Sequence, residues 1–377
     1  MISGQNNGTS GEPYSPLTSR HPLFEHNFGQ CSTSNLSRSS AISVCSSGNI
    51  STNGIASKCI ITVALPGSNK KHNTIELVVD LKTRLENVLN QIAVLVGLND
   101  VDFFGLAVKN TLSMDDEYRF LDLETKVQTA IPKNVLKGLR RTTSGFFRKQ
   151  VPSHFNDQSA VTLYLRVVCY VDNPILIRDY VALQLYYDQL RENALEYGQL
   201  IVPETCFTLA TLALQADRQP LPYNGYGDDK SETPDELQID ISKPLTADEL
   251  PFYVPDYIIK SQGSNFITQQ LPRLQRELAD MSRVEAQLMY CRYASQRPFH
   301  VNIHMYGIKR KKTDTYHTLW LGIGYRGLDV FEDIDGRFKK LIGSFDWASV
   351  QKIQTNVCFT VFYCLILIAL YFVGQMY

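Results

Sequence analysis

The spacing of apolar residues changes along this chain from the period of a strand to that of a helix, and this change limits the fold most. Apolar side chains alternate over residues 59–65 and again over 75–79, which indicates two β-strands joined by a turn. Over residues 85–95 they recur every three or four residues, as on one face of an amphipathic helix. We expect Asp80 to cap the start of this helix and Gly97 to end it.

Two further strands are expected after this helix. One covers residues 101–108, and a longer one covers 161–171 and places Cys169 on its apolar face. The order strand, strand, helix and strands is that of a small ubiquitin-like roll. The loop 134–158 between the two later strands is basic. Its candidate lipid- or anion-binding residues are Arg140, Arg141, Arg148 and Lys149. The phosphorylation candidates beside them are Thr142, Thr143 and Ser144, where a phosphate would cancel positive charge.

A second unit is expected to be helical. Apolar residues from Leu176 to Ala194 advance by alternating steps of four and three, and Pro203 stands where another helix can begin. The sequence from Ser282 to Glu285 is a capping box. It predicts a helix with one face formed by Val284, Leu288 and Cys291. With an acidic, proline-containing loop at 218–250, these patterns predict a four-helix bundle with one long insertion.

A third unit returns to strands. The expected strands cover residues 299–305, 319–325, 328–331, 341–345 and 349–353. The most basic run of the chain falls in the hairpin loop that should join the first two. Its residues, which we predict to contact phosphoinositide headgroups, are Lys309, Arg310, Lys311 and Lys312. Near an anionic leaflet each such charge contributes about 1 kcal/mol, so four could tether a lobe reversibly.

Composition excludes several classes of protein. The 377 residues carry a net charge of −1, so no global field draws the chain toward nucleic acid. The eight cysteines contain no CxxC pair, which favours reduced thiols over a disulfide framework or a zinc site. Residues 1–57 are rich in Ser, Gly, Asn and Thr, and they lack the layout of a signal peptide. Such a segment buries too little apolar surface to order itself, so we expect a disordered tail.

No catalytic or metal site is predicted. Cys291 and Arg297 have the spacing of a tyrosine phosphatase loop, but the residues between them include no glycine, and Cys291 should pack as a small core hydrophobe. His300 and His304 are four residues apart, yet the alternating pattern around them predicts a strand rather than a helical metal pair. No phosphate-binding glycine loop is found, and no cofactor is expected.

Several stretches in this order resemble the FERM family. In the first unit the resemblance is carried by Phe104-Gly105-Leu106, followed by the run from Leu163 to Asn173. The remaining stretches that carry the resemblance are 176–195, 209–217, 306–308, 319–323, 327–331 and 345–353. The resemblance implies an α+β, three-lobed FERM architecture of ubiquitin-like roll, four-helix acyl-CoA-binding-like bundle and PH/PTB-like sandwich. The stretches 252–260, 266–272 and 285–288 look most like the Willin/Expanded branch of FERM domain-containing proteins.

The resemblance implies a non-enzymatic adaptor that links the plasma membrane and cell junctions to the cytoskeleton. Implied partners are membrane phosphoinositides, the cytoplasmic tails of membrane proteins, and junction or signalling proteins, with Hippo-type growth control for the Willin/Expanded branch. The implied location is cytoplasmic, peripheral at the plasma membrane, at junctions and on the cytoskeleton. Nucleic acid is not an expected partner.

The chain departs from the family pattern after Ile353. Residues 357–374 are eighteen residues without a charge, near the minimum length for a bilayer span. They are either a membrane anchor or an alternative end, and the PH-like sandwich is then incomplete. Two other functions stay open: a fragment of a FERM-containing tyrosine phosphatase that lacks its catalytic domain, and a tail-anchored FERM protein. The expected segments are a tail at 1–57, the lobes 58–173, 174–297 and 298–354, and an apolar tail at 355–377.

Overall fold

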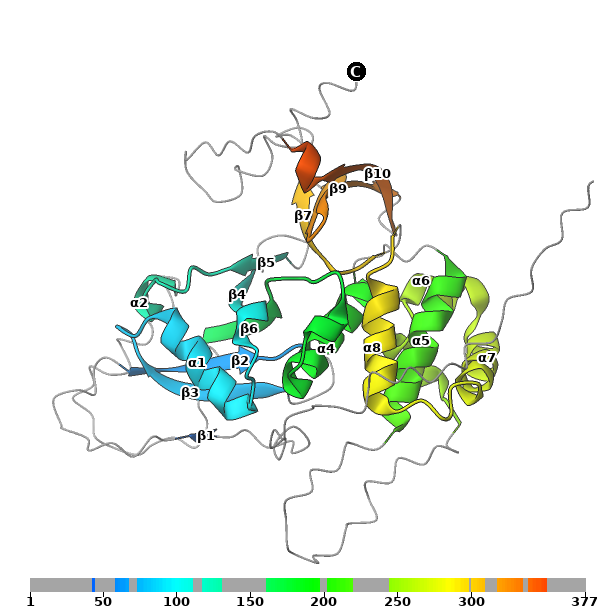
Figure 1. The fold of residues 1–377 in the computed structure, drawn as a ribbon, viewed down its shortest axis with the longest axis horizontal. Helices are drawn as coiled ribbons and strands as arrows, with labels where there is room; N and C mark the ends of the chain where they lie inside the picture. The colour runs from blue at the N-terminus through cyan, green and yellow to red at the C-terminus, as the bar shows by residue number, and fades with distance from the viewer. Residues whose placement is uncertain are drawn as a thin grey trace, which may run out of the picture. The chain divides into compact units, whose positions relative to one another are not determined.

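Helices and strands form the three expected groups of elements along the chain (Figure 1). The computed structural model describes residues 43–44, 58–67, 73–110, 117–130, 161–196, 202–219, 244–297, 300–308, 317–334 and 338–350.

A mixed sheet forms the first group. Its strands are β1 (Ser43–Val44), β2 (Lys58–Ala64), β3 (Thr74–Asp80), β4 (Phe104–Asn110), β5 (Glu117–Phe120) and β6 (Val161–Val167). They lie in the order β1-β3-β2-β6-β4-β5. β6 runs parallel to β2 and antiparallel to β4, so the last strand of this group lies between β2 and β4. Two short helices, η3 (Val101–Phe103) and α2 (Val127–Ala130), complete this group.

Helix α1 (Leu85–Val96) lies across this sheet and confirms the predicted apolar face (Figure 1). Leu85, Val88, Leu89 and Ile92 are buried in the same core as the sheet. Gly97 ends the helix with φ of 74°, as predicted. The prediction for Asp80 is wrong. Arg84 is the N-cap without a side-chain cap, and the Asp80 carboxylate instead accepts from the backbone N–H of Lys82 at 2.8 Å.

Strand β6 is shorter than the sequence predicted. It ends at Val167, because the next two backbone N–H groups turn to the carbonyl oxygen of Phe103. Leu163 and Leu165 are buried on the predicted face, whereas Cys169 lies beyond the strand and is exposed.

The second group is helical. Its elements are η4 (Pro174–Leu176), α4 (Tyr180–Glu196), α5 (Pro203–Arg218), η6 (Ala247–Phe252), α6 (Asp256–Gln262), α7 (Ser264–Arg276) and α8 (Arg283–Ala294). Pro203 begins α5 as predicted, and the Ser282–Glu285 capping box precedes α8. The proposed start of the first long helix at Leu176 is wrong, because this residue ends η4 and is 60% exposed.

The face of α8 also differs from the prediction. Cys291 is buried, but Val284 and Leu288 are only half-buried. The fully packed face instead lies along Ala286, Gln287, Tyr290, Cys291 and Ala294. The buried face includes the polar residue Gln287, so a pattern based on apolar residues alone does not identify it. The side chain of Gln287 donates a hydrogen bond to Gln184 at 2.6 Å.

The third group is a four-stranded antiparallel sheet. Its strands are β7 (Ile303–Ile308), β8 (Leu319–Gly324), β9 (Gly327–Ile334) and β10 (Phe338–Asp346), in sequential order. Both faces of this sheet are apolar, with Ile308, Leu321, Leu328 and Val330 on one side and Ile303, Met305, Trp320 and Phe331 on the other. The strand expected over 349–353 is wrong at its start, because Trp347–Ser349 form the short helix η7.

One hydrophobic core contains buried side chains of both the first sheet and the helices. In the ranges that the structure describes, no helix is both long enough and apolar enough to span a bilayer. The uncharged stretch 357–374 lies outside the described residues.

Candidate functional site

The residues that follow β6 contact all three groups of elements, and we call Val168–Asp172 the connecting segment. The backbone N–H of Val168 donates to the carbonyl oxygen of Phe103, in the first group, at 2.7 Å. The backbone N–H of Val171 donates to the hydroxyl of Tyr186, on α4, at 3.2 Å. Two of the three groups are therefore fixed to one short stretch of backbone.

The third group reaches the same segment. The imidazole Nε2 of His304 on β7 donates to the carbonyl oxygen of Val168 at 2.8 Å. Arg326, in the turn between β8 and β9, donates to the carboxylate of Asp172 at 3.1 Å, and Tyr325 donates to the same oxygen. The connecting segment is thus one of the points at which the C-terminal sheet is held.

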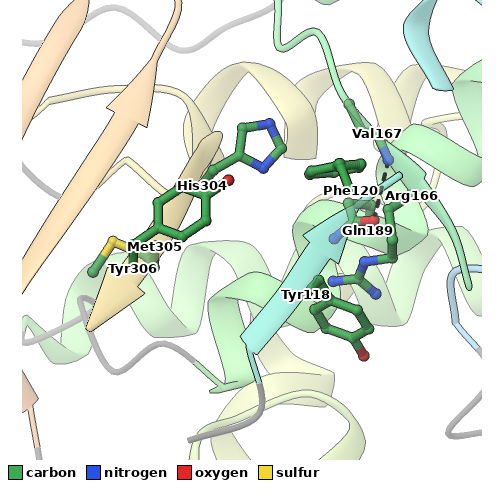
Figure 2. A pocket seen from close by; sticks show the side chains of 8 residues that line it. All are labelled: Tyr118, Phe120, Arg166, Val167, Gln189, His304, Met305 and Tyr306. Atoms are coloured by element: carbon green, nitrogen blue, oxygen red, sulfur yellow. Dashed lines mark hydrogen bonds between the residues drawn. The ribbon is translucent and has the colours of Figure 1, made fainter. Parts of the chain in front are cut away.

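A small cavity lies beside this contact. Figure 2 shows side chains of β7 on one side of it and side chains of β5, β6 and α4 on the other. The centre of a water molecule can occupy about 10 Å³ of it. That volume suits one water molecule and no organic ligand, so the cavity marks a packed junction rather than a substrate pocket. The lining residues are Tyr118, Phe120, Arg166, Val167, Gln189, His304, Met305 and Tyr306.

A buried ion pair stands next to the cavity. The Arg166 guanidinium on β6 pairs with the Glu192 carboxylate on α4, and the side chains are 5% and 9% exposed. The other oxygen of Glu192 accepts from the backbone N–H of Gly67 at 2.6 Å. The ring of Tyr118 lies 4.0 Å from the guanidinium carbon. Glu192 therefore joins the first sheet to the helices through two charge-assisted contacts.

His304 is held in an apolar setting. Its ring lies 5.2 Å from that of Phe120 and 4.7 Å from that of Tyr170, measured between centroids. The pKa of His304 is lowered to about 4, first by burial and also by the positive charge of Arg166, against the opposing effect of the hydrogen bond to the Val168 carbonyl. The imidazole is therefore neutral at neutral pH and donates one hydrogen bond from Nε2.

This low pKa predicts a pH-dependent stability. Unfolding returns His304 to a pKa near its ordinary 6.5, so the unfolded chain binds the extra proton first and stability falls as the pH drops from 6.5 toward 4. A His304→Gln variant keeps a donor for Val168 but cannot titrate. Urea midpoints of the two proteins should therefore diverge over this window and run parallel above pH 7. Parallel profiles at every pH would contradict the assignment.

A second polar cluster stands on the C-terminal sheet. His300 precedes β7, and its Nε2 lies 2.8 Å from the buried carboxylate of Asp329 on β9. Ser344 on β10 donates to the other oxygen of Asp329, and Arg297 contacts both residues. Burial alone raises the pKa of Asp329, but the hydrogen bonds from His300 and Ser344 and the charge of Arg297 bring it below its ordinary value.

This geometry does not form a nucleophilic triad. Ser344 donates to Asp329 rather than to His300, so the imidazole is not placed to take the proton of the hydroxyl. Cys291 packs in the core, where burial raises the pKa of its thiol above the ordinary range, as its interpretation as a core residue requires. Among the described residues, no group of three possible ligands could hold a metal ion.

The residues proposed from sequence as lipid-binding or phosphorylation sites lie outside the described residues. They are Arg140, Arg141, Thr142, Thr143, Ser144, Arg148, Lys149, Lys309, Arg310, Lys311 and Lys312. The strands that flank the last four, β7 and β8, pair in the antiparallel manner that a hairpin requires. Sequence reasoning missed Arg166 and Glu192, whose burial no local pattern signals.

Two domain models of one family match the chain. The model of the FERM N-terminal domain matches residues 71–133, and that of the FERM central domain matches 172–306. Together they cover more than half of the 377 residues. The chain belongs to the FERM family.

Curated relatives agree with this assignment and are much longer than the chain. Human tyrosine-protein phosphatase non-receptor type 13 is 26% identical over 280 residues, which are 74% of this chain and 10% of that protein. Protein expanded of Drosophila melanogaster is 22% identical over 331 residues, or 74% of this chain and 22% of that protein. Mouse FERM and PDZ domain-containing protein 2 is 23% identical and covers 75% and 18%. Expanded, to which the sequence was predicted to be related, is thus one of several FERM proteins that this chain resembles.

Solved structures share the fold. The FERM and C-terminal domain complex of Drosophila Merlin superposes with a TM-score of 0.51 at 16% identity, covering 79% of this chain and 82% of that chain. The human myosin 7b C-terminal MyTH4-FERM domain, solved with the harmonin-a PDZ3 domain, gives 0.53 at 15% identity and covers 85% and 60%. The three-lobed FERM architecture is confirmed.

Proposed function

We propose that this chain is a non-enzymatic FERM adaptor that meets the inner leaflet and protein partners at the same time. The observation that carries the proposal is the joining of three lobes at the connecting segment by specific hydrogen bonds. A molecule built in this way can present surfaces of different lobes together. The lobe boundaries that we propose are 58–173, 174–297 and 298–354.

Membrane contact is proposed for the two basic loops identified in the sequence. Antiparallel pairing of β7 with β8 supports a hairpin loop around Lys309–Lys312. Clusters of lysine and arginine near an anionic leaflet give reversible binding. Phosphate on Thr142, Thr143 or Ser144 would reduce the attraction of the neighbouring loop. The proposed location is the cytoplasmic side of the plasma membrane and cell junctions.

Neutralising Lys309, Arg310, Lys311 and Lys312 together as glutamines should weaken binding to phosphoinositide-containing vesicles by two orders of magnitude or more. Each removed charge costs about 1 kcal/mol near the surface. Co-sedimentation measures the effect. A matched control removes four exposed charges of the helical lobe: Lys260, Arg273, Arg276 and Arg292. Equal loss in both variants, or no loss in either, would sink the membrane assignment.

Protein partners are proposed to be cytoplasmic tails of membrane proteins and junction or signalling proteins. The myosin 7b relative, solved with a PDZ domain, supports protein binding as a use of this fold. The finer proposal of Hippo-type growth control is supported by the likeness to Expanded. Deletion of the gene tests it: growth control should be lost in the deletion and restored when the intact chain is expressed again.

A second candidate is a fragment of a FERM-containing phosphatase, favoured by the 26% identity to the phosphatase relative over a tenth of its length. Sequencing of full transcripts decides between them, because a phosphatase domain after the FERM region would support the fragment. A third candidate, a tail-anchored FERM protein, rests on the stretch 357–374. Carbonate extraction of the full chain beside a version that ends at Ile353 tests it, since only an inserted tail resists extraction.

A further inference from the structure

In the described part of the chain, strand β10 is one of the two outer strands of the C-terminal sheet; the other is β7. Backbone hydrogen bonds on the two sides of β9 fix which backbone groups of β10 face outward. The N–H of Asp333 donates to Thr318, on the β8 side of β9, at 3.1 Å. On the other side of β9, the carbonyl oxygen of Arg326, directly before this strand, accepts from the N–H of Trp347, directly after β10, at 2.9 Å. Since backbone groups alternate along a strand, even-numbered residues of β9 face β10 and odd-numbered residues face β8.

The register then assigns the outer edge of β10. Leu341 and Ser344 pair with Phe331 and Asp329, two odd-numbered residues of β9. Their own N–H and C=O groups therefore point away from β9, and the described residues provide no strand on that side. Lys339 and Asp346 pair with Asp333 and Gly327, which are also odd-numbered, so their backbone N–H and C=O groups point away from β9 as well.

These four side chains also lie on one face of the sheet. The ammonium of Lys339 is 4.4 Å from the ring centroid of Trp320, and Leu341 packs in the cluster that contains Trp320. Ser344 donates to Asp329 on the same face. Arg297, which contacts Asp329, also lies 3.9 Å from the carboxylate of Asp346. Without the one-residue bulge between Leu341 and Gly343, the residues before and after it would face opposite sides.

We propose that β10 pairs antiparallel with β10 of a second copy of this chain. A two-fold axis between Ile342 and Gly343 places Leu341 opposite Ser344, and Lys339 opposite Asp346, each of them twice. The outward backbone groups of these four pairs then exchange hydrogen bonds, and each Lys339–Asp346 pair brings together opposite charges. The symmetry makes the interface self-complementary and closed, so it yields dimers and not fibres.

The centre of this register also fits. Ile342 is 44% exposed, the one large apolar side chain exposed within the described part of β10. In the pairing it lies beside Gly343 of the second copy, which has no side chain to obstruct it. A bulge and lysines protect an edge strand against unrelated partners, whereas a second copy supplies a matching bulge and matching aspartates. The partner that this edge fits is therefore the same chain.

Sedimentation velocity of the full chain over a range of micromolar concentrations tests the proposal. We expect a monomer–dimer equilibrium. Asp346→Lys turns two opposite-charge pairs into like-charge pairs and should raise the dissociation constant by about tenfold or more. Asp346 is 70% exposed, so this variant should fold. Lys339→Asp should have the same effect.

Two combinations decide the matter. A Lys339→Asp/Asp346→Lys double variant restores both charge pairs and should dimerise like the wild type. An equal mixture of the two single variants should form the mixed dimer, since each lysine then meets an aspartate. A chain that stays monomeric, or association that ignores these exchanges (as aggregation through the apolar tail would), overturns the proposal. Neither result affects the proposed adaptor function, which the vesicle experiment tests separately.

Discussion

Replacing Glu192 with glutamine is expected to lower the free energy of unfolding by about 3 kcal/mol or more. The substitution keeps the shape of the side chain and an oxygen for the N–H of Gly67. It removes the carboxylate of Glu192 from the guanidinium of Arg166, which is buried at 5% exposure. Removing one partner of a buried ion pair costs far more than an exposed ion pair contributes. Urea denaturation followed by circular dichroism measures the change.

A double replacement separates charge from packing. In the variant Arg166→Met/Glu192→Leu neither charge of the pair remains, so most of the lost stability should return. The single variant Arg166→Met should resemble Glu192→Gln, because Glu192 is 9% exposed and would then lose its positively charged partner. If Glu192→Gln unfolds at the same urea concentration as the wild type, the pair does not hold the first sheet to the helices.

Replacing Gly327 with alanine is expected to disrupt the C-terminal sheet. A Cβ atom at this position would lie 1.9 Å from the carbonyl oxygen of Phe345 and 2.8 Å from the Cα of Asp346. Both are backbone atoms of β10, so the clash is relieved only if β9 and β10 separate. We expect a loss of about 3 kcal/mol, at the upper end for overpacking. Hydrogen exchange should show faster exchange along β10.

Gly343, one strand further on, supplies the control. Its added Cβ would meet only the ring of Phe345, at 3.3 Å, and a ring can shift by a few tenths of an ångström. Gly343→Ala should therefore change stability by less than about 1 kcal/mol. Equal effects of the two alanines, or normal exchange protection of β10 in Gly327→Ala, would mean that the strands are not paired in this register.

Local patterns predicted the elements that are stabilised locally. Helix α1 follows from the spacing of Leu85, Val88, Leu89 and Ile92, and Gly97 ends it because only glycine adopts its left-handed conformation without strain. The helix after Ser282 follows from a capping box whose two hydrogen bonds join residues three apart. In such cases the contacts that determine the structure join residues only a few positions apart, so a local sequence pattern contains them.

The errors arise where distant contacts decide. The alternation from Val161 continues past Val167, yet the strand stops there because Phe103 takes the next two N–H groups. Asp80 has the chemistry of a cap, but its carboxylate is used in the turn with Lys82. Neither competition is visible in the local sequence.

The site was the least predictable part. Candidate residues were chosen as basic runs in loops, and these lie outside the described residues. The connecting segment was read as the end of a strand. Its importance depends on His304 and Arg326, which are more than a hundred positions away in the sequence. A single sequence holds no signal for such pairs, whereas the order of the lobes is encoded in the succession of strand and helix periods.

The position of the full chain in living cells tests the proposed adaptor function most directly. A fluorescent fusion should concentrate at the plasma membrane and cell junctions. The variant with Lys309, Arg310, Lys311 and Lys312 replaced by glutamine should shift to the cytosol, and the matched variant of four helical-lobe charges should not. A wild-type fusion spread evenly through the cell, or a loop variant that stays at the membrane, would contradict the adaptor function proposed for this FERM chain.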